Sequence, residues 1–261
     1  MTSSRLAANV AWLFPGLPWL DRFAAARDAG FAAVEFPWPD DPEATARAVR
    51  DAGLRVVLMN VAAGDLAAGE RGWPNDPARR DAWRAAMRAA LDLAADVGCP
   101  TLNVLAGNRV GHADAAAQLA CLEDNLAWAC ERAAARAVTV VSELMNRREN
   151  PDYLLVDWED CVPLLDRLGP LGWRIQLDTH HLALTEDDVP AAIRRANGRI
   201  GHLQVSDAPG RHEPGSGALD WPAIGRALAD AGYAGPVALE YVPLRDPAEV
   251  AAQGFEWLVS R

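Results

Sequence analysis

Short apolar segments alternate with longer segments of helical periodicity along the chain. The apolar segments have the length and composition of buried parallel strands. They lie at residues 6–10, 33–36, 55–60, 101–105, 138–143, 174–178, 200–205 and 237–241. Between them, apolar residues recur at every third or fourth position, which is typical of helices that cover a sheet. These helices are predicted at residues 19–29, 42–52, 77–97, 113–136, 156–168, 187–197, 220–231 and 247–259.

Eight strands alternating with eight helices predict an α/β protein with the architecture of a (β/α)8 TIM barrel. Gly53 and Gly98 fall just past two of the helices, where a left-handed residue commonly ends a helix. A doubly wound sheet has the same alternation, but here polar residues recur at strand ends throughout the chain rather than at one crossover point. The 261 residues contain no linker or low-complexity tract, which predicts a single domain spanning residues 1–261.

Four side chains with oxygen donors stand at the carboxyl ends of four different predicted strands: Glu143, Asp178, Gln204 and Glu240. In a barrel of parallel strands these ends converge on the face that carries the chemistry. Three carboxylates and an amide oxygen suit a hard cation, so we expect one divalent ion, Mg²⁺ or Mn²⁺. Glu143 and Glu240 are also placed to exchange protons with a substrate. The alternative for each glutamate is a structural ion pair with an arginine.

Further polar residues near the same strand ends are candidates for substrate binding. His181 follows three residues after one of the strands and could bind the metal or a substrate hydroxyl. His202 lies deeper on its strand. This position favours a role in orienting a metal ligand rather than in binding the metal directly. Asn9, Glu35 and Asn60 end the first three strands and could bind substrate oxygens or cap loops.

Two arginines are candidates for binding an anionic group. Arg71 belongs to the glycine-bracketed segment 62–72 after the third strand, which could act as a lid. Arg211 follows the seventh strand over the same mouth of the barrel. A guanidinium can hold a carboxylate with two parallel hydrogen bonds. For Arg71, a salt bridge to Glu70 or another nearby acid is an equally good interpretation.

Composition excludes several classes of protein. The net charge of −11 argues against nucleic acid and anionic membranes as partners. The chain has no lysine, and Schiff-base aldolases, pyridoxal-phosphate enzymes and P-loop nucleotidases all need one. No apolar run reaches the roughly 18 residues of a membrane span, and no signal-peptide pattern is present. Four cysteines without CxxC spacing indicate reduced thiols, so a cytoplasmic location is expected.

The chain resembles the xylose-isomerase-like barrels and, within them, the hydroxypyruvate isomerase family. The resemblance covers essentially the whole chain. It is densest in AAGDLAAGERG at residues 62–72, in IGHLQVSDAPGRHEPGSG at residues 200–217, and in the glutamates that end strands five and eight. Gln204 stands where the related sugar 3-epimerases carry histidine, which points to the hydroxypyruvate isomerase branch. That branch includes the closely similar 2-oxo-tetronate isomerases.

The resemblance implies an intramolecular oxidoreductase of the aldose–ketose type. Glu143, Asp178, Gln204 and Glu240 match the metal positions of the family, and the two glutamates match its proton donor and acceptor. Such an enzyme moves a carbonyl between adjacent carbons of a small hydroxy-oxo acid through an enediolate. The implied substrate is hydroxypyruvate, giving tartronate semialdehyde (2-hydroxy-3-oxopropanoate), or a 2-oxo-tetronate. Association into a homo-oligomer is expected by resemblance alone.

Other functions remain open at this point. Residues 146–149, Asn-Arg-Arg-Glu, look like the sugar 3-epimerases, which use a glutamate at the position of Glu149 near the substrate. A ketose 3-epimerase acting on neutral sugars is therefore the nearest alternative. An endonuclease for abasic DNA shares the barrel but needs several metal-binding histidines and a basic groove, which the net charge disfavours. A barrel that only senses a sugar acid would leave the four oxygen donors unexplained.

Overall fold

A closed barrel of parallel strands forms the centre of the molecule, as the alternation of segments predicts. The computed structural model describes residues 5–186 and 188–253, and within them eight strands follow one another around the barrel in chain order. The first strand pairs in parallel with the last and closes the ring. The strands are β1 (Leu6–Asn9), β2 (Ala33–Phe36), β3 (Arg55–Asn60), β4 (Thr101–Asn103), β5 (Thr139–Glu143), β6 (Arg174–Asp178), β7 (Ile200–Val205) and β8 (Val237–Leu239).

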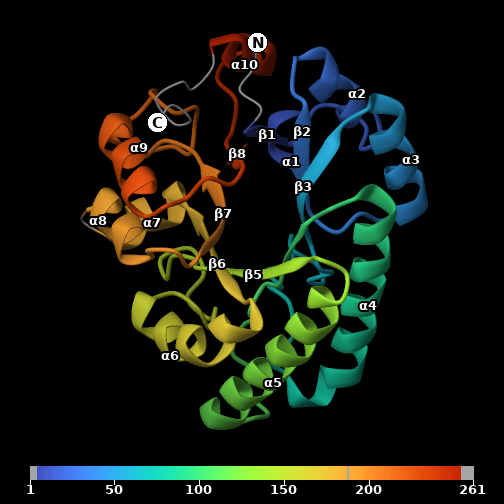
Figure 1. Ribbon diagram of the computed structural model, residues 1–261, viewed down its shortest axis with the longest axis vertical. Coiled ribbons are helices and arrows are strands. Elements are labelled where there is room, and N and C mark those ends of the chain that lie inside the picture. Colours follow the sequence, from blue (N-terminus) through green and yellow to red (C-terminus); the bar gives the residue numbers. More distant parts are fainter. Residues whose placement is uncertain (1–4, 187, 254–261) are drawn as a thin grey trace.

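The helices that alternate with the strands lie outside the ring of strands (Figure 1). They are α2 (Asp21–Asp28), α3 (Pro42–Ala52), α4 (Arg80–Val97), α5 (Ala115–Ala134), α6 (Trp158–Leu168), α8 (Val189–Arg195), α9 (Trp221–Asp230) and α10 (Pro247–Gln253). Two short helices that the sequence pattern did not predict follow strands directly: α1 (Val10–Leu13) and α7 (Thr179–Thr185). None of the helices in the described ranges is long and apolar enough to cross a lipid bilayer.

Capping residues explain where several predicted helix boundaries were wrong. Asp114, Asp157 and Asp220 were assigned to helices, but each adopts a non-helical backbone and caps the helix that follows it. The predicted glycine caps are confirmed, because Gly53 and Gly98 end their helices with φ of 67° and 66°. The predicted helices at 187–197 and 247–259 include residue 187 and residues 254–259, which lie outside the described residues.

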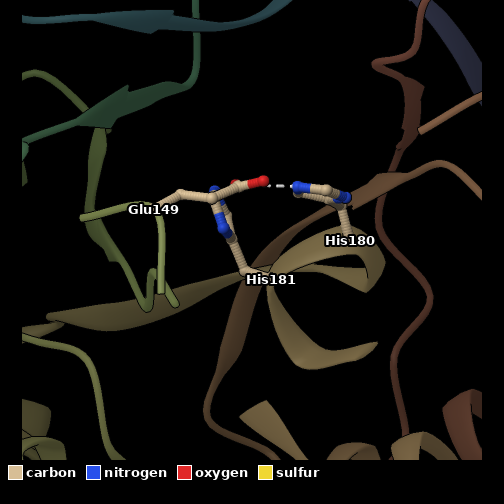
Figure 2. Close-up of side chains that lie close together, drawn as sticks. All are labelled: Glu149, His180 and His181. Atoms are coloured by element: carbon tan, nitrogen blue, oxygen red, sulfur yellow. Dashed lines mark hydrogen bonds and ion pairs between the residues drawn. The ribbon is translucent and has the colours of Figure 1, made fainter. Parts of the chain in front are cut away.

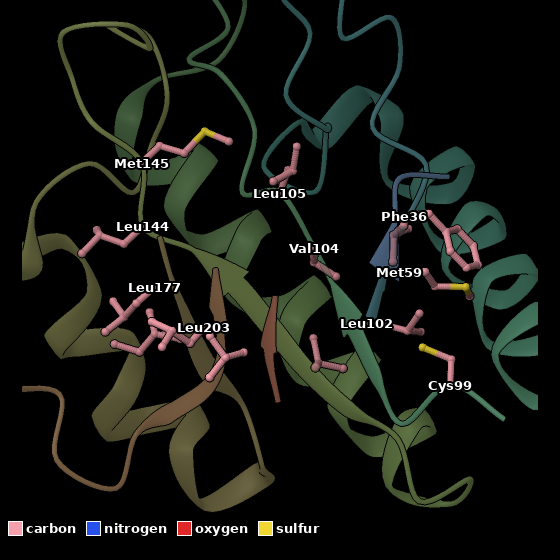
Figure 3. Close-up of a cluster of buried hydrophobic side chains, with 14 of the residues drawn as sticks. Phe36, Met59, Cys99, Leu102, Val104, Leu105, Leu144, Met145, Leu177 and Leu203 are labelled. Atoms are coloured by element: carbon pink, nitrogen blue, oxygen red, sulfur yellow. The ribbon is translucent and has the colours of Figure 1, made fainter. Parts of the chain in front are cut away.

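Apolar side chains fill the space between barrel and helices (Figure 3). Phe36, Met59, Leu102 and Leu203 from four different strands are at most 1% exposed. Burial of each such side chain stabilises the fold by about 1.5–3 kcal/mol. This packing fixes the strands against one another, and it therefore fixes the positions of the polar side chains at their carboxyl ends.

Candidate active site

A cavity of about 370 Å³ opens where the strands end. This volume fits a small ligand. Eight of the ten predicted site residues line it: Asn60, Arg71, Glu143, Glu149, His181, Gln204, Arg211 and Glu240. Asp178 and His202 do not line the cavity, but Asp178 accepts a hydrogen bond from Arg211, which does. The barrel therefore brings together side chains from β3, β5 and β7 and from the segments that follow β6 and β8.

Three carboxylates gather around the guanidinium of Arg211. Its Nη2 donates to Asp178 Oδ2 at 2.7 Å and to Glu240 Oε1 at 2.6 Å. His181 Nε2 lies 3.3 Å from Glu143 Oε1 and 3.9 Å from Asp178 Oδ2. All three carboxylate residues are buried, so their charges interact strongly.

The electrostatics of this cluster show an excess of negative charge. Burial raises the pKa of Glu240 well above its usual range, and Asp178 and Glu143 raise it further against the opposing effect of Arg211. Burial lowers the pKa of His181, but the hydrogen bond to Glu143 and the charges of Glu143 and Asp178 outweigh it and raise the pKa overall. Arg211 contacts two of the three carboxylates, and its positive charge opposes the rise in the pKa of Glu240.

Buried polar groups at the ends of β1 and β2 hydrogen-bond to Glu240 and Gln204, and one of these groups, Asn9, also lines the cavity. Asn9 Nδ2 donates to Glu240 Oε2 at 2.7 Å and to Glu35 Oε1 at 2.9 Å. Glu35 also accepts from Gln204 Nε2 at 2.6 Å, and its other oxygen is hydrogen-bonded to His202 Nε2. His202 therefore contacts Glu35 and does not line the cavity, so the structure does not place it beside any of the four proposed metal ligands. Asn9 and Glu35, which end β1 and β2, form this supporting network.

The residues present fit a divalent metal ion. Oxygen atoms of Glu143 and Asp178 and a ring nitrogen of His181 lie within 4.8 Å of one another. Asp178 and Glu240 are close enough for a single guanidinium nitrogen to bridge them. Such a set of anionic oxygens, with one imidazole beside it, suits Mg²⁺ or Mn²⁺.

Gln204 fits such an ion once its amide is reversed. Its Nε2 donates to Glu240 Oε2, while its Oε1 accepts from Gln176 Nε2 at 2.7 Å. Gln176 Oε1 is buried and has no partner in the part of the chain that the structure describes, so it could accept from Gln204 if both amides turned. Gln204 Nε2 would then give up its hydrogen bonds to Glu240 and to Glu35 Oε1, and a cation bound between the carboxylates would have to compensate for that loss. A half-turn of both amides would keep their mutual hydrogen bond and direct Gln204 Oε1 toward Glu240. The pair can therefore present a donor or an acceptor to the cavity.

Glu149 lies at the cavity, where His180 of α7 contacts it (Figure 2) and Asn146 of its own connection also holds it. Its Oε2 lies 2.9 Å from His180 Nε2 and accepts from Asn146 Nδ2 at 3.0 Å. Asn146 Nδ2 also donates to His181 Nδ1 at 2.6 Å. Burial raises the pKa of Glu149, but the hydrogen bonds from Asn146 and His180 outweigh this and lower it. The carboxylate of Glu149 is thereby favoured over the protonated acid.

Arg71 reaches the cavity without an acidic partner among the described residues. Its Nε donates to Asn150 Oδ1 at 3.0 Å, and its Nη1 donates to the carbonyl oxygens of Leu66 and Glu70 at 3.1 and 2.8 Å. The carboxylate of Glu70 instead contacts Arg79 at 3.1 Å. The alternative of an Arg71–Glu70 salt bridge is therefore not what the structure contains, and the charge of Arg71 is left for a ligand.

The loop after β7 projects Arg211 into the carboxylate cluster. Asp207 organises its base by accepting backbone N–H groups, together with the indole N–H of Trp221. Glu213 Oε1 accepts the N–H groups of Leu244 and Arg245, both at 2.8 Å. Arg211 itself has φ of 54°, a left-handed conformation that non-glycine residues rarely adopt and that is common at functional sites.

Residues 23–261 match the family described as the xylose isomerase-like TIM barrel. The chain belongs to this family. It is 39% identical over 241 residues to a 2-oxo-tetronate isomerase of Cupriavidus necator, a match that covers 92% of this chain and 93% of the relative. It is 37% identical over 268 residues to a putative hydroxypyruvate isomerase of Streptomyces coelicolor, covering 97% and 95%. These full-length relatives are isomerases, and we therefore class this xylose isomerase-like barrel as an isomerase.

A solved structure supports the same assignment of fold. The structure titled AP endonuclease, family 2, from Brucella melitensis superimposes with a TM-score of 0.88 at 34% identity, covering 97% of this chain and 98% of that one. The predicted (β/α)8 architecture is confirmed by this match and by the strand order of the barrel.

The sequence patterns did not identify some residues of this xylose isomerase-like barrel that contact the site. Asn146 and Asn150 were not singled out, although both lie in the same connection as Glu149. Gln176 stands two residues before Asp178 on β6, the same spacing as His202 and Gln204 on β7. That repeated spacing was the available signal, because residues two apart on a strand face the same side.

Proposed function

We propose that this protein is a divalent-metal-dependent isomerase of small hydroxy-oxo acids, acting on hydroxypyruvate or on a 2-oxo-tetronate. The observation that carries the proposal is the position of Glu143, which ends β5, and Glu240, which follows β8. Both line one cavity beside Arg71, whose guanidinium has no acidic partner among the described residues. Two carboxylates with access to one small substrate suit the transfer of a proton between neighbouring carbons. The names of the full-length relatives support this class of reaction.

Each residue of the cluster has a defined part in this proposal. Glu143, Asp178, Gln204 and Glu240 would hold the metal, either Mg²⁺ or Mn²⁺. When bound, the metal would polarise the substrate carbonyl and stabilise the negative charge of an enediolate. One of the two glutamates removes the proton from the hydroxyl-bearing carbon beside the carbonyl, and a glutamate returns a proton to the former carbonyl carbon. The hydroxyl proton passes from the oxygen of the first carbon to the oxygen of the second, so that the protons balance. The carbonyl then stands one carbon further along the substrate.

Arg71 is the proposed anchor for the carboxylate of the substrate. Asn150 and two backbone carbonyls hold its guanidinium in place, so little rotational freedom is lost when a ligand binds. A fixed guanidinium favours an acid over a neutral sugar by a charge-assisted hydrogen bond. This contact would give the enzyme its preference for hydroxy-oxo acids.

One observation favours a second candidate, a ketose 3-epimerase. Glu149 lies at the cavity as a carboxylate, held by Asn146 and His180, and could accept hydrogen bonds from sugar hydroxyls. A 3-epimerase would use the same two glutamates to remove and return a proton at the carbon next to a ketone. A neutral sugar offers no anionic group to the guanidinium of Arg71, and this weighs against the second candidate.

A proton NMR time course in D₂O tests both candidates. Metal-stripped protein is mixed with hydroxypyruvate, with a 2-oxo-tetronate or with D-fructose, and Mn²⁺ or Mg²⁺ is then added in catalytic amount. Metal-dependent loss of an acid with deuterium entering the product supports the isomerase. A new ketose from fructose with both acids unchanged would replace the proposal with the 3-epimerase.

We also propose the cytoplasm as the location of the protein. All four cysteines are free and buried. Reduced thiols are typical of proteins in a reducing compartment such as the cytoplasm.

A further inference from the structure

Arg211 makes its closest contacts with two residues that are proposed to bind the metal. A single nitrogen, Nη2, donates to both Asp178 Oδ2 and Glu240 Oε1. The guanidinium carbon lies 4.2 Å from the centre of the Trp12 ring, and the side chain is only 15% exposed. Arg211 is therefore a buried cation positioned between two carboxylates.

These contacts and a bound divalent ion exclude one another. An ion held by the same two carboxylates would need their oxygens at about 2.0–2.6 Å. The guanidinium would then lie beside a doubly charged cation in a site of low dielectric, where like charges repel strongly. Arg211 must leave Asp178 and Glu240 before these residues can hold the ion.

We propose that Arg211 is the built-in counter-cation of this carboxylate pair and that its release on metal binding provides a second guanidinium, beside Arg71, for an acidic substrate. With its contacts to Asp178 and Glu240 broken, the guanidinium remains in the cavity and can pair with an anionic group of the ligand. The metal and an acidic substrate then bind cooperatively, with the metal first. This inference rests on the proposed metal-dependent function and adds a binding order to it.

The local structure allows the side chain to move while its backbone stays fixed. Asp207 and Glu213 anchor the loop on both sides of Arg211 through several backbone N–H groups. Arg211 Nε is buried without a partner within residues 5–186 and 188–253, so it does not tie the guanidinium to its present position. The face of Trp12 offers a flat surface over which the cation can shift and keep a favourable contact.

Arg71 provides a matched comparison, because it is a second guanidinium in the same cavity. Its contacts are with Asn150 and two backbone carbonyls, and it bonds to none of the proposed metal ligands. Removing Arg71 takes one positive charge from the cavity without freeing the two carboxylates. The two arginines therefore separate a general charge effect from direct competition.

The first test measures Mn²⁺ binding without substrate, by electron paramagnetic resonance of the free ion, for the unmodified protein, Arg211→Met and Arg71→Met. Arg211→Met should bind Mn²⁺ about tenfold more tightly or better, a factor that loss of one close buried ion pair can supply. Arg71→Met should change the dissociation constant by less than about threefold. An unchanged or weaker affinity in Arg211→Met overturns the inference and leaves the proposed function standing. Lack of Mn²⁺ binding by all three proteins overturns both.

The second test uses the unmodified protein, so it does not depend on the folding of a variant. Arginines are modified with phenylglyoxal in EDTA or in Mn²⁺, and the modified peptides are quantified by mass spectrometry. Release from its two carboxylates should make Arg211 react several times faster in Mn²⁺, whereas Arg71 should react equally in both conditions. Equal rates at Arg211 in the two conditions would contradict the proposed release.

Discussion

Asn9 donates a hydrogen bond to Glu240 across the seam where the barrel closes, with 2.7 Å between Nδ2 and Oε2. The first strand of the barrel thus orients a carboxylate that directly follows the last. Asn9→Ala would leave Glu240 and Glu35 each without one buried donor. We expect the free energy of unfolding to fall by about 1.5–3 kcal/mol and turnover to fall with it. Urea denaturation and steady-state kinetics measure the two effects, and wild-type kcat in the folded variant would contradict the orienting role.

Glu240→Gln tests the proposed proton transfer. The amide keeps the volume and much of the hydrogen bonding of the carboxylate but cannot accept the proton. Turnover should fall by about a hundredfold or more while circular dichroism stays unchanged. Glu43→Gln serves as the control, since that glutamate is on α3 with its side chain 90% exposed. Near-normal activity in folded Glu240→Gln protein would contradict the proposed role of Glu240 in proton transfer.

Gln176→Leu should weaken metal binding although Gln176 lies behind the proposed ligands. It removes the only side chain in the described ranges that is hydrogen-bonded to Gln204 Oε1. Residues that orient metal ligands commonly change the affinity by about 10–100-fold, and calorimetry with Mn²⁺ would measure the loss. Gln118→Leu removes another buried glutamine, whose side chain hydrogen-bonds to Asn75, Val110 and Ala113 and to none of the proposed metal ligands. If the two variants lose equal affinity, the effect is one of general destabilisation.

Asp207 should contribute to stability in a pH-dependent way. Burial raises its pKa, but hydrogen bonds from Trp221 and from backbone N–H groups outweigh this and hold the pKa below the ordinary 3.8. A carboxyl group with a lowered pKa in the folded state stabilises above its unfolded pKa, and the contribution disappears as the pH falls through the folded value. Asp207→Asn should therefore be less stable than wild type at pH 7, with the gap narrowing below pH 3.8. A gap that stays constant down to pH 2.5 would argue against this account.

The four thiols should be unreactive in the folded protein. Burial raises the pKa of Cys99, Cys130 and Cys161 to about 12, and it also raises the pKa of Cys121. At pH 8 almost no thiolate is present to attack a reagent. Ellman's reagent should detect no thiol in native protein and all four after denaturation in urea. Rapid labelling of the native protein would contradict the predicted burial.

The periodic features of the fold could be predicted from the sequence because burial repeats along the chain. Buried parallel strands are continuously apolar, and covering helices are apolar on one side, so the strand order and helix α3 were predicted correctly. Helix α7 was missed because it begins immediately after β6, where Asp178 both ends the strand and caps the helix. Because one residue serves both elements, the sequence contains no connecting segment that would mark the end of the strand and the start of the helix.

The positions of the candidate site residues could be predicted better than their contacts. Strand ends converge in any parallel barrel, and this brought Glu143, Gln204 and Glu240 to one cavity. The bridge from Arg211 to two carboxylates depends on the path of a loop held by Asp207, which no local pattern encodes. The orientation of the Gln204 amide likewise depends on a neighbour from another strand. Contacts between side chains distant in sequence require the folded geometry.

Glu213 joins two connections that are separate in the sequence. Its carboxylate sits in the loop after β7 and accepts the N–H groups of Leu244 and Arg245, in the segment after β8. For protein engineering, these connections form one exchangeable unit. A graft of residues 206–219 into a related barrel should transfer the arginine geometry only if residues 240–245 are transferred with it.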